Sequence, residues 1–98
     1  MGEFAVHALG SGSLHVDVQS DLLEPFATRV VIPLLAPEHA SQAPRRLNPV
    51  FEVAGSRRIL ATQLLAALPR AELGAPVGSL AAERDSIRSA LDMLVLGF

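Results

Sequence analysis

Cysteine is absent from the 98-residue sequence, and so are tryptophan and tyrosine. The lack of cysteine excludes disulfide bonds, thiolate metal sites and cysteine nucleophiles. Long apolar runs are also missing, because none approaches the roughly 20 residues that a membrane-spanning helix needs. The first residues lack the basic stretch and apolar segment of a secretory signal, so we expect a cytoplasmic protein with no membrane partner.

Positive charge is scarce as well. The formal net charge is -2, which fits poorly with a protein whose main partner is nucleic acid, because phosphate binding usually requires a strongly basic face. We therefore expect no direct, specific binding of nucleic acid. All 8 basic residues are arginine, however. Arginine favours fixed, bidentate contacts, so recognition of an anion at one place on the surface remains open.

Hydrophobic residues, in contrast, make up 50% of the chain. A chain of this length has room for one domain, which we place over residues 1–98, but not for a large core around a deep cleft. One small core cannot hide so much apolar surface. We therefore expect a second subunit to cover part of it in a homodimer.

The N-terminal half has the patterns of β-strands. We expect a first strand over residues 3–9, ending at the glycine- and serine-rich residues 10–13. Apolar residues alternate with polar ones over residues 14–19, the period of a strand with one buried face. The β-branched residues of 28–34 predict a third strand. Residues 36–49, with three prolines, are typical of a long surface connection, and such loops often carry binding.

The next segment predicts a hairpin and then becomes ambiguous. Residues 50–53 and 57–62 flank Ala54-Gly55-Ser56, which is short enough for a β-hairpin connection. Residues 59–68 are rich in alanine and leucine at helical spacings, and propensity alone favours a helix there.

The C-terminal part predicts a helix as its last element. Residues 71–73 could form a short strand, residues 74–78 are typical of a turn, and Ser79 is a plausible helix cap. Apolar residues then recur at spacings of three or four, with charged residues between them, at Ile87, Leu91, Leu94 and Phe98. This helix is expected to run almost to the last residue.

Several of these segments together resemble the CcdB family over nearly the whole chain. The most specific is the run Val16-Asp17-Val18-Gln19-Ser20-Asp21 followed by Leu22-Leu23, which resembles the family's second strand and its exit. Residues 31–34 and 47–50 lie at about the family's spacing, and residues 87–98 resemble its C-terminal helix, with the terminal glycine as Gly97. The resemblance implies a mainly β fold: an SH3-like antiparallel barrel of the CcdB/PemK type, with a small accessory sheet, a C-terminal α-helix and a two-fold dimer. It also argues against a helix near Leu64.

The same resemblance implies a function. Members of the CcdB family are toxins of type II toxin–antitoxin systems that bind the DNA gyrase A subunit and trap its cleaved-DNA complex, and a CcdA-like antitoxin neutralises them. On this reading the protein acts by binding and is not an enzyme. The positions that match the family's gyrase-contacting set are Leu22, Leu23, Asp92, Val95, Leu96, Gly97 and Phe98.

The sequence departs from the family's best-known toxin at two of these positions. That toxin has tryptophan where this chain has Leu96, and its indole stacks on a gyrase arginine. Such a stack is worth on the order of 2 kcal/mol, whereas leucine offers apolar contact alone. Asp92 replaces a neutral amide and adds charge near the helix end. Phe98 could restore an aromatic contact, which we state as a hypothesis.

Other polar groups have simpler interpretations. His15 and Asp17 share a strand face and could form an acid/base pair, but an ordinary polar face is the simpler account. The three histidines have no metal-ligand spacing, so we expect no metal site and no cofactor. The pairs Arg45-Arg46 and Arg57-Arg58 are ordinarily solvated charge. An acidic antitoxin tail is nevertheless a plausible anion for Arg45 and Arg46.

Two alternative functions stay open at this point. One is a MazF/Kid-like endoribonuclease, which would need a basic groove and a residue that activates the ribose 2′-hydroxyl. The other is a toxin decayed by the substitution at Leu96, which would retain antitoxin binding alone.

Overall fold

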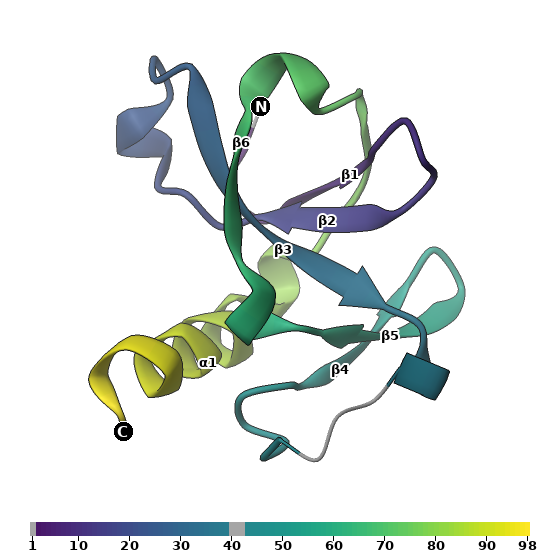
Figure 1. The fold of residues 1–98 in the computed structure, drawn as a ribbon, viewed down its shortest axis with the longest axis vertical. Helices are drawn as coiled ribbons and strands as arrows, with labels where there is room; N and C mark the ends of the chain where they lie inside the picture. Colours follow the sequence, from purple (N-terminus) through teal and green to yellow (C-terminus); the bar gives the residue numbers. More distant parts are fainter. Residues whose placement is uncertain (1, 40–42) are drawn as a thin grey trace.

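The computed structural model describes residues 2–39 and 43–98. In these ranges a curled antiparallel sheet of seven strands packs against one α-helix, α1 (Arg84–Leu96) (Figure 1). The strands are β1 (Ala5–Ala8), β2 (Leu14–Asp17), β3 (Thr28–Leu35), β4 (Val50–Val53), β5 (Ser56–Leu60), β6 (Ala66–Pro69) and β7 (Pro76–Ser79). Short 3-10 helices connect them: η1 (Asp21–Leu23), η2 (Pro37–His39), η3 (Thr62–Leu64), η4 (Arg70–Glu72) and η5 (Ala81–Glu83). The mainly β architecture with a C-terminal helix is confirmed.

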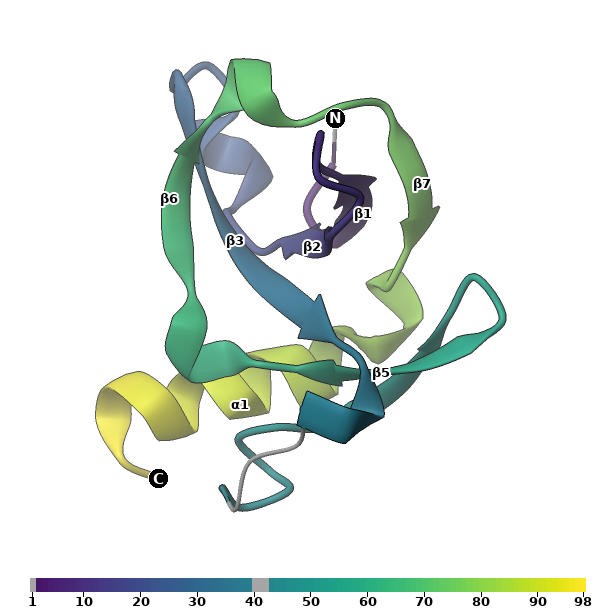
Figure 2. The ribbon, with the colours of Figure 1, turned by 45° about the vertical axis from the view of Figure 1, so that its right-hand side comes forward.

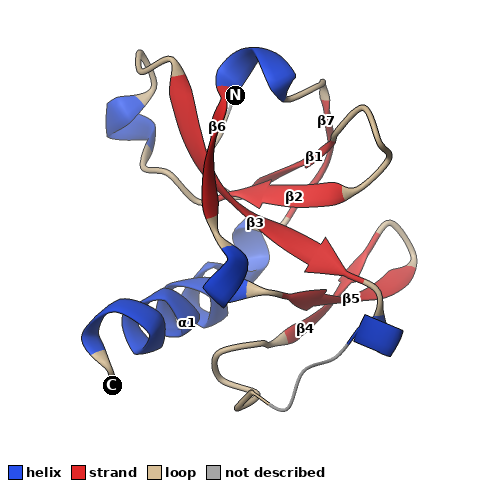
Figure 3. Ribbon diagram, in the orientation of Figure 1, coloured by secondary structure: helices blue, strands red, loops and turns tan. Residues whose placement is uncertain are grey.

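The long strand β3 organises the sheet. One edge of β3 pairs with β2, which pairs in turn with β1 and then β7. The other edge is shared, because β6 pairs with the first half of β3 and β5 pairs with Leu34 and Leu35 near its end. The β4–β5 hairpin therefore projects from the end of β3 as the outer part of the same sheet, so the accessory sheet expected from the resemblance is continuous with the main one (Figure 3). Figure 2 shows β6 and β7 on opposite sides of the β1–β2 hairpin, which gives the sheet its barrel-like curl.

The main core lies between the curled sheet and α1. Ile87 and Ala90 on α1 are fully buried, so the predicted stripe faces inward at Ile87, whereas its members Leu94 and Phe98 are exposed. They pack into a cluster formed by β1 to β5 and by the residues next to β1 and β7, namely Phe4, Val6, Val16, Ile32, Leu34, Phe51, Val53, Leu60 and Leu80. Leu91 packs against the edge of this cluster. Later residues of α1 extend past the core.

The predicted β4–β5 hairpin is confirmed, and its turn explains why. Ala54 has a φ of 52° and Gly55 a φ of 81°, so both loop residues are left-handed. Two consecutive left-handed residues make the tight turn whose twist matches that of the paired strands. Glycine adopts this conformation at no steric cost, which is why Gly55 is a useful signal.

The prediction of an α-helix over residues 59–68, which rests on propensity, is wrong. In its place, β5 ends at Leu60, η3 follows, and β6 pairs with β3, with Leu68 opposite Arg29 and Ala67 opposite Val30. Backbone hydrogen bonds to an available sheet edge outweigh a modest helix preference. The family resemblance argued against an α-helix near Leu64, and the structure confirms this, because only the short 3-10 helix η3 lies there.

Three smaller predictions in the C-terminal part are also wrong. Residues 71–73 do not form a strand, because η4 occupies Arg70–Glu72. Residues 74–78 are not simply a turn, since β7 begins at Pro76 and completes the sheet beside β1. The Ser79 hydroxyl accepts from the Ala81 N–H at 3.1 Å beside the start of η5, whose N-cap residue is Leu80, and α1 starts after Glu83 without a side-chain cap.

Within the described ranges, none of the helices has the length and apolar character needed to span a membrane.

Candidate partner-binding surface

The end of α1 exposes apolar side chains beyond the core. Val95, Leu96 and Phe98 are 72%, 58% and 74% exposed, and together with the partly exposed Leu94 they form what we term the α1 patch. Gly97 ends the helix in the left-handed conformation, with φ 81°, and its N–H donates to the carbonyls of Asp92 and Met93 at 3.2 Å. The chain therefore turns at Gly97, and Phe98 leaves the helix axis.

A second exposed apolar group lies at η1. Leu22 is 91% exposed, and with Leu23 and Phe26 it forms what we term the η1 patch. The Ser20 hydroxyl accepts from the Leu22 N–H at 3.1 Å and fixes the start of this turn. Phe26 is missing from the residues predicted from the sequence, because nothing in its local pattern distinguishes an exposed phenylalanine from a buried one.

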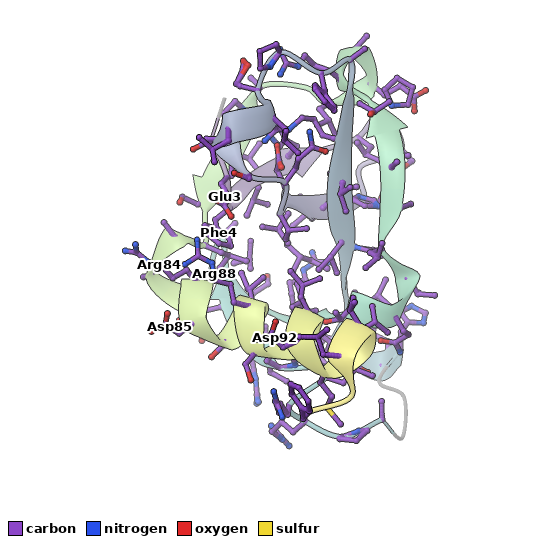
Figure 4. All side chains as sticks on the ribbon, turned by 90° about the vertical axis from the view of Figure 1, so that its left-hand side faces the viewer. Glu3, Phe4, Arg84, Asp85, Arg88 and Asp92 are labelled. Carbon is purple, nitrogen blue, oxygen red and sulfur yellow. The ribbon has the colours of Figure 1, made fainter. Side chains whose placement is uncertain are left out.

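The segments that carry the two patches, η1 and the end of α1, lie on the same side of the molecule, and Glu3, Phe4 and Arg88 lie between η1 and the first half of α1 (Figure 4). The Glu3 N–H donates to the Asp21 carboxylate of η1 at 2.8 Å, and the Glu3 carboxylate lies 3.6 Å from the Arg88 guanidinium of α1. Arg88 also lies over the Phe4 ring, 5.4 Å from its centroid. Through these contacts the N-terminal turn connects η1 to α1. Asp92 is exposed further along the same helix.

A buried ion pair in the interior of the sheet is connected to η1 by hydrogen bonds. Asp17 and Arg29 are both 0% exposed, and the Arg29 guanidinium donates to the two Asp17 carboxylate oxygens at 2.8 and 3.1 Å. The second of these oxygens also accepts from the Gln19 N–H at 3.0 Å, and the Gln19 amide donates to the Leu23 carbonyl at 3.4 Å. A charged network therefore runs from the interior of the sheet to the η1 patch.

The sequence predicts an ordinary polar face on β2, and the structure differs because Asp17 on that strand is buried. Asp17 is committed to Arg29 inside the protein, so it forms no acid/base pair with His15. The sequence offered no signal for this pairing, because Arg29 lies 12 residues away on another strand. His15 itself is partly buried, and this burial lowers the pKa of its imidazole below the ordinary 6.5, with a hydrogen bond to the Ser13 backbone opposing the shift. His15 is therefore uncharged at neutral pH.

Arg45 and Arg46, predicted to bind antitoxin, lie against the side of α1. They line a shallow hollow of about 420 Å³ together with Pro49, Asp85, Ser86 and Ser89. The Arg46 guanidinium donates to the Ser89 hydroxyl at 2.7 Å and to the main-chain oxygen of Phe98 at 2.6 Å. Arg46 thus has partners within the chain, whereas the sequence suggested two equivalent solvated arginines.

Solved structures with a similar fold include toxins and endoribonucleases. An endoribonuclease from Mycobacterial species matches with a TM-score of 0.75 at 17% identity, covering 100% of this chain and 92% of its own. An endoribonuclease from Mycobacterial species in complex with its cognate antitoxin matches with a TM-score of 0.78 at 17% identity, covering 100% and 96%. The Mycobacterium tuberculosis toxin MazF-mt6 matches with a TM-score of 0.77 at 11% identity, covering 92% and 94%. At these identities the likeness shows the fold alone.

The sequence itself assigns the family. The model of the family described as CcdB protein matches residues 3–97, so this chain belongs to the CcdB family. It is a toxin of a toxin–antitoxin system.

One expectation from the sequence is contradicted by these comparisons. We expected a protein that is not an enzyme, on the grounds of its resemblance to a family of gyrase poisons. Chains that share its fold over its whole length are endoribonucleases, so a non-catalytic mechanism does not follow from this architecture.

Proposed function

We propose that this toxin binds the A subunit of DNA gyrase through the η1 and α1 patches and holds gyrase in the state in which DNA is cleaved but not resealed. The observation that carries the proposal is the exposure of both segments that the family resemblance assigns to gyrase contact. Leu22 in one segment and Val95, Leu96 and Phe98 in the other are more than half exposed.

The composition of this face supports a protein partner. Two groups of large apolar side chains with charged residues between them match the usual anatomy of an interface, in which apolar anchors are desolvated and a polar rim orients the partner. Glu3, Arg88 and Asp92 supply charge around the apolar groups. Exposed apolar side chains gathered at a chain end are costly in water unless a partner covers them.

The proposal includes a homodimer and an antitoxin. A two-fold dimer would present two α1 patches together, which suits a target that is itself a dimer. An acidic, flexible antitoxin segment would bind at the hollow beside Arg45, where a guanidinium is exposed. The solved endoribonuclease with its cognate antitoxin has the same fold, which supports an antitoxin partner for this chain.

Cleavage of RNA is a second candidate function, favoured by the endoribonucleases of the same fold and by the state of His15. A general base must be uncharged to take a proton from a ribose 2′-hydroxyl, and the lowered pKa of His15 leaves it uncharged at neutral pH. The Arg29 guanidinium is 0% exposed and paired with Asp17, so it presents no cationic group at the surface for such a site.

The experiment that tests the main proposal mixes purified toxin, gyrase from the native host, ATP and supercoiled plasmid, and then removes protein with detergent and protease. We expect linear DNA to accumulate with toxin and gyrase together and with neither alone. A parallel reaction contains RNA and a chelator in place of gyrase and plasmid. RNA fragments without linear DNA would overturn gyrase trapping in favour of the second candidate. Antitoxin binding with neither product would instead identify a decayed toxin.

A further inference from the structure

The side chain of Arg46 reaches from the 43–49 segment to α1 and to the residue that follows its last turn. Its Nε donates to the Ser89 hydroxyl at 2.7 Å, and its Nη2 donates to the Phe98 main-chain oxygen at 2.6 Å. The two acceptors are separated by nine positions in the sequence but lie within the span of one guanidinium. The planar fork of arginine is suited to joining two fixed acceptors in this way.

The backward turn at Gly97 makes this double contact feasible. The left-handed Gly97 reverses the chain after Leu96, so the Phe98 oxygen comes within reach of the side of the helix that carries Ser89. The last carbonyls of a helix have no partners within it, and terminal residues fray unless another segment binds them. Among the described residues, the hydrogen bonds that hold Gly97 and Phe98 are those from the Gly97 N–H and those from Arg46.

We propose that Arg46 is a positioning residue: it clamps Phe98 to Ser89 and so holds the α1 patch in the orientation that the partner meets. The identity of that partner rests on the proposed function, but the clamp itself is a property of the free toxin. The Phe98 ring is 74% exposed while its main chain is bound, so the clamp orders the residue without covering its side chain. A pre-ordered anchor loses less conformational entropy when it binds.

Arg45 provides a matched comparison. It precedes Arg46, carries the same charge, lines the same hollow and is exposed, yet it makes neither of the two bonds. Replacing Arg45 therefore changes the local charge as much as replacing Arg46 does, and leaves the clamp intact. Ser89→Ala removes one anchor of the clamp with no change in charge.

The experiment compares wild type, Arg46→Gln, Arg45→Gln and Ser89→Ala in two measurements. The first is amide hydrogen exchange at Gly97 in the free toxin, where we expect faster exchange in Arg46→Gln, a smaller increase in Ser89→Ala and none in Arg45→Gln. The second is the affinity for the gyrase A subunit. There we expect Arg46→Gln to bind about fivefold more weakly, since the competent orientation becomes a minor fraction.

The outcomes separate the clamp from the proposed function. If wild-type toxin fails to bind gyrase, the proposed function is wrong. The exchange measurement at Gly97 still shows whether Arg46 orders the end of α1 in the free toxin. Equal effects of Arg45→Gln and Arg46→Gln on affinity, with unchanged exchange at Gly97, would overturn the proposal, because charge alone would then explain the data. Should Arg46→Gln unfold, the uncharged Ser89→Ala variant carries the same test, and unchanged Gly97 exchange there would contradict the clamp.

Discussion

The η1 and α1 patches expose similar side chains, but the fold holds them in different ways. The η1 patch is bonded through Gln19 to an ion pair with no solvent exposure, so its position depends on the interior of the sheet. The α1 patch extends past the core and is fixed by one helix turn and by the exposed contacts of Arg46. The first is therefore expected to open only with the whole sheet, while the second opens locally at small cost. Substitutions can separate these two modes of support.

The largest expected effect comes from breaking the buried pair. Asp17→Asn removes the buried carboxylate that pairs with Arg29 and leaves only the exposed one of Asp21 nearby, and removing one partner of a buried pair costs about 3–5 kcal/mol. We expect urea denaturation to show a loss of this size in the free energy of unfolding. Asp21→Asn is the control, because Asp21 is mainly exposed and lies 4.0 Å from Arg29. A loss under about 1 kcal/mol in Asp17→Asn would show that η1 does not depend on this network.

The next effect separates binding from stability within the η1 patch. Leu22→Ser changes a side chain that is 91% exposed, so we expect the free energy of unfolding to change by less than about 0.5 kcal/mol. Loss of an apolar anchor should weaken gyrase binding by about tenfold or more. Val77→Ser is the matched control, since Val77 is also more than half exposed but lies on β7. Equal binding by the two variants would remove η1 from the proposed interface.

A gain of function tests the α1 patch. Leu96→Trp places an aromatic ring at an exposed position of the last helical turn, where stacking on an arginine of the partner is worth on the order of 1–2 kcal/mol. We expect stronger growth inhibition on induction, with unchanged thermal stability. Unchanged toxicity, with stable expression of both forms, would indicate that residue 96 does not meet a cationic group.

The smallest effect concerns pH. Since burial lowers the pKa of His15 below 6.5, the unfolded chain binds its proton at a higher pH than the folded protein does. The contribution of His15 to stability is therefore complete above pH 6.5 and declines as the pH falls through the folded pKa. We expect His15→Gln to show a shallower loss of thermal stability between pH 7 and pH 5 than wild type. A parallel loss in both proteins would contradict this assignment.

Local pattern was a good guide to the strands whose neighbours along the chain are also their neighbours in the sheet. The β1–β2 and β4–β5 hairpins and β3 were predictable because alternation, β-branched residues and turn glycines report on local structure. The segments containing β6 and β7 were misassigned. Each pairs with a strand far away in sequence, β6 with β3 and β7 with β1, so the deciding hydrogen bonds leave no local trace.

The same distinction applies to the candidate site. Exposure at the end of α1 was predictable, because a helical stripe that continues past the core has nothing left to cover it. Burial of Asp17 could not be predicted, since its counterion Arg29 lies on another strand. The different roles of Arg45 and Arg46 were also hidden, because consecutive arginines look alike until a helix packs beside one of them.

By itself the sequence determined the family, the order of most elements and the apolar character of the η1 and α1 patches, since these depend on composition and short-range spacing. Tertiary structure alone decided which charges are buried, which strand edges are filled and which arginine holds the last turn of α1. Those outcomes depend on contacts between residues distant along the chain, and their energies arise when the sheet closes around the core.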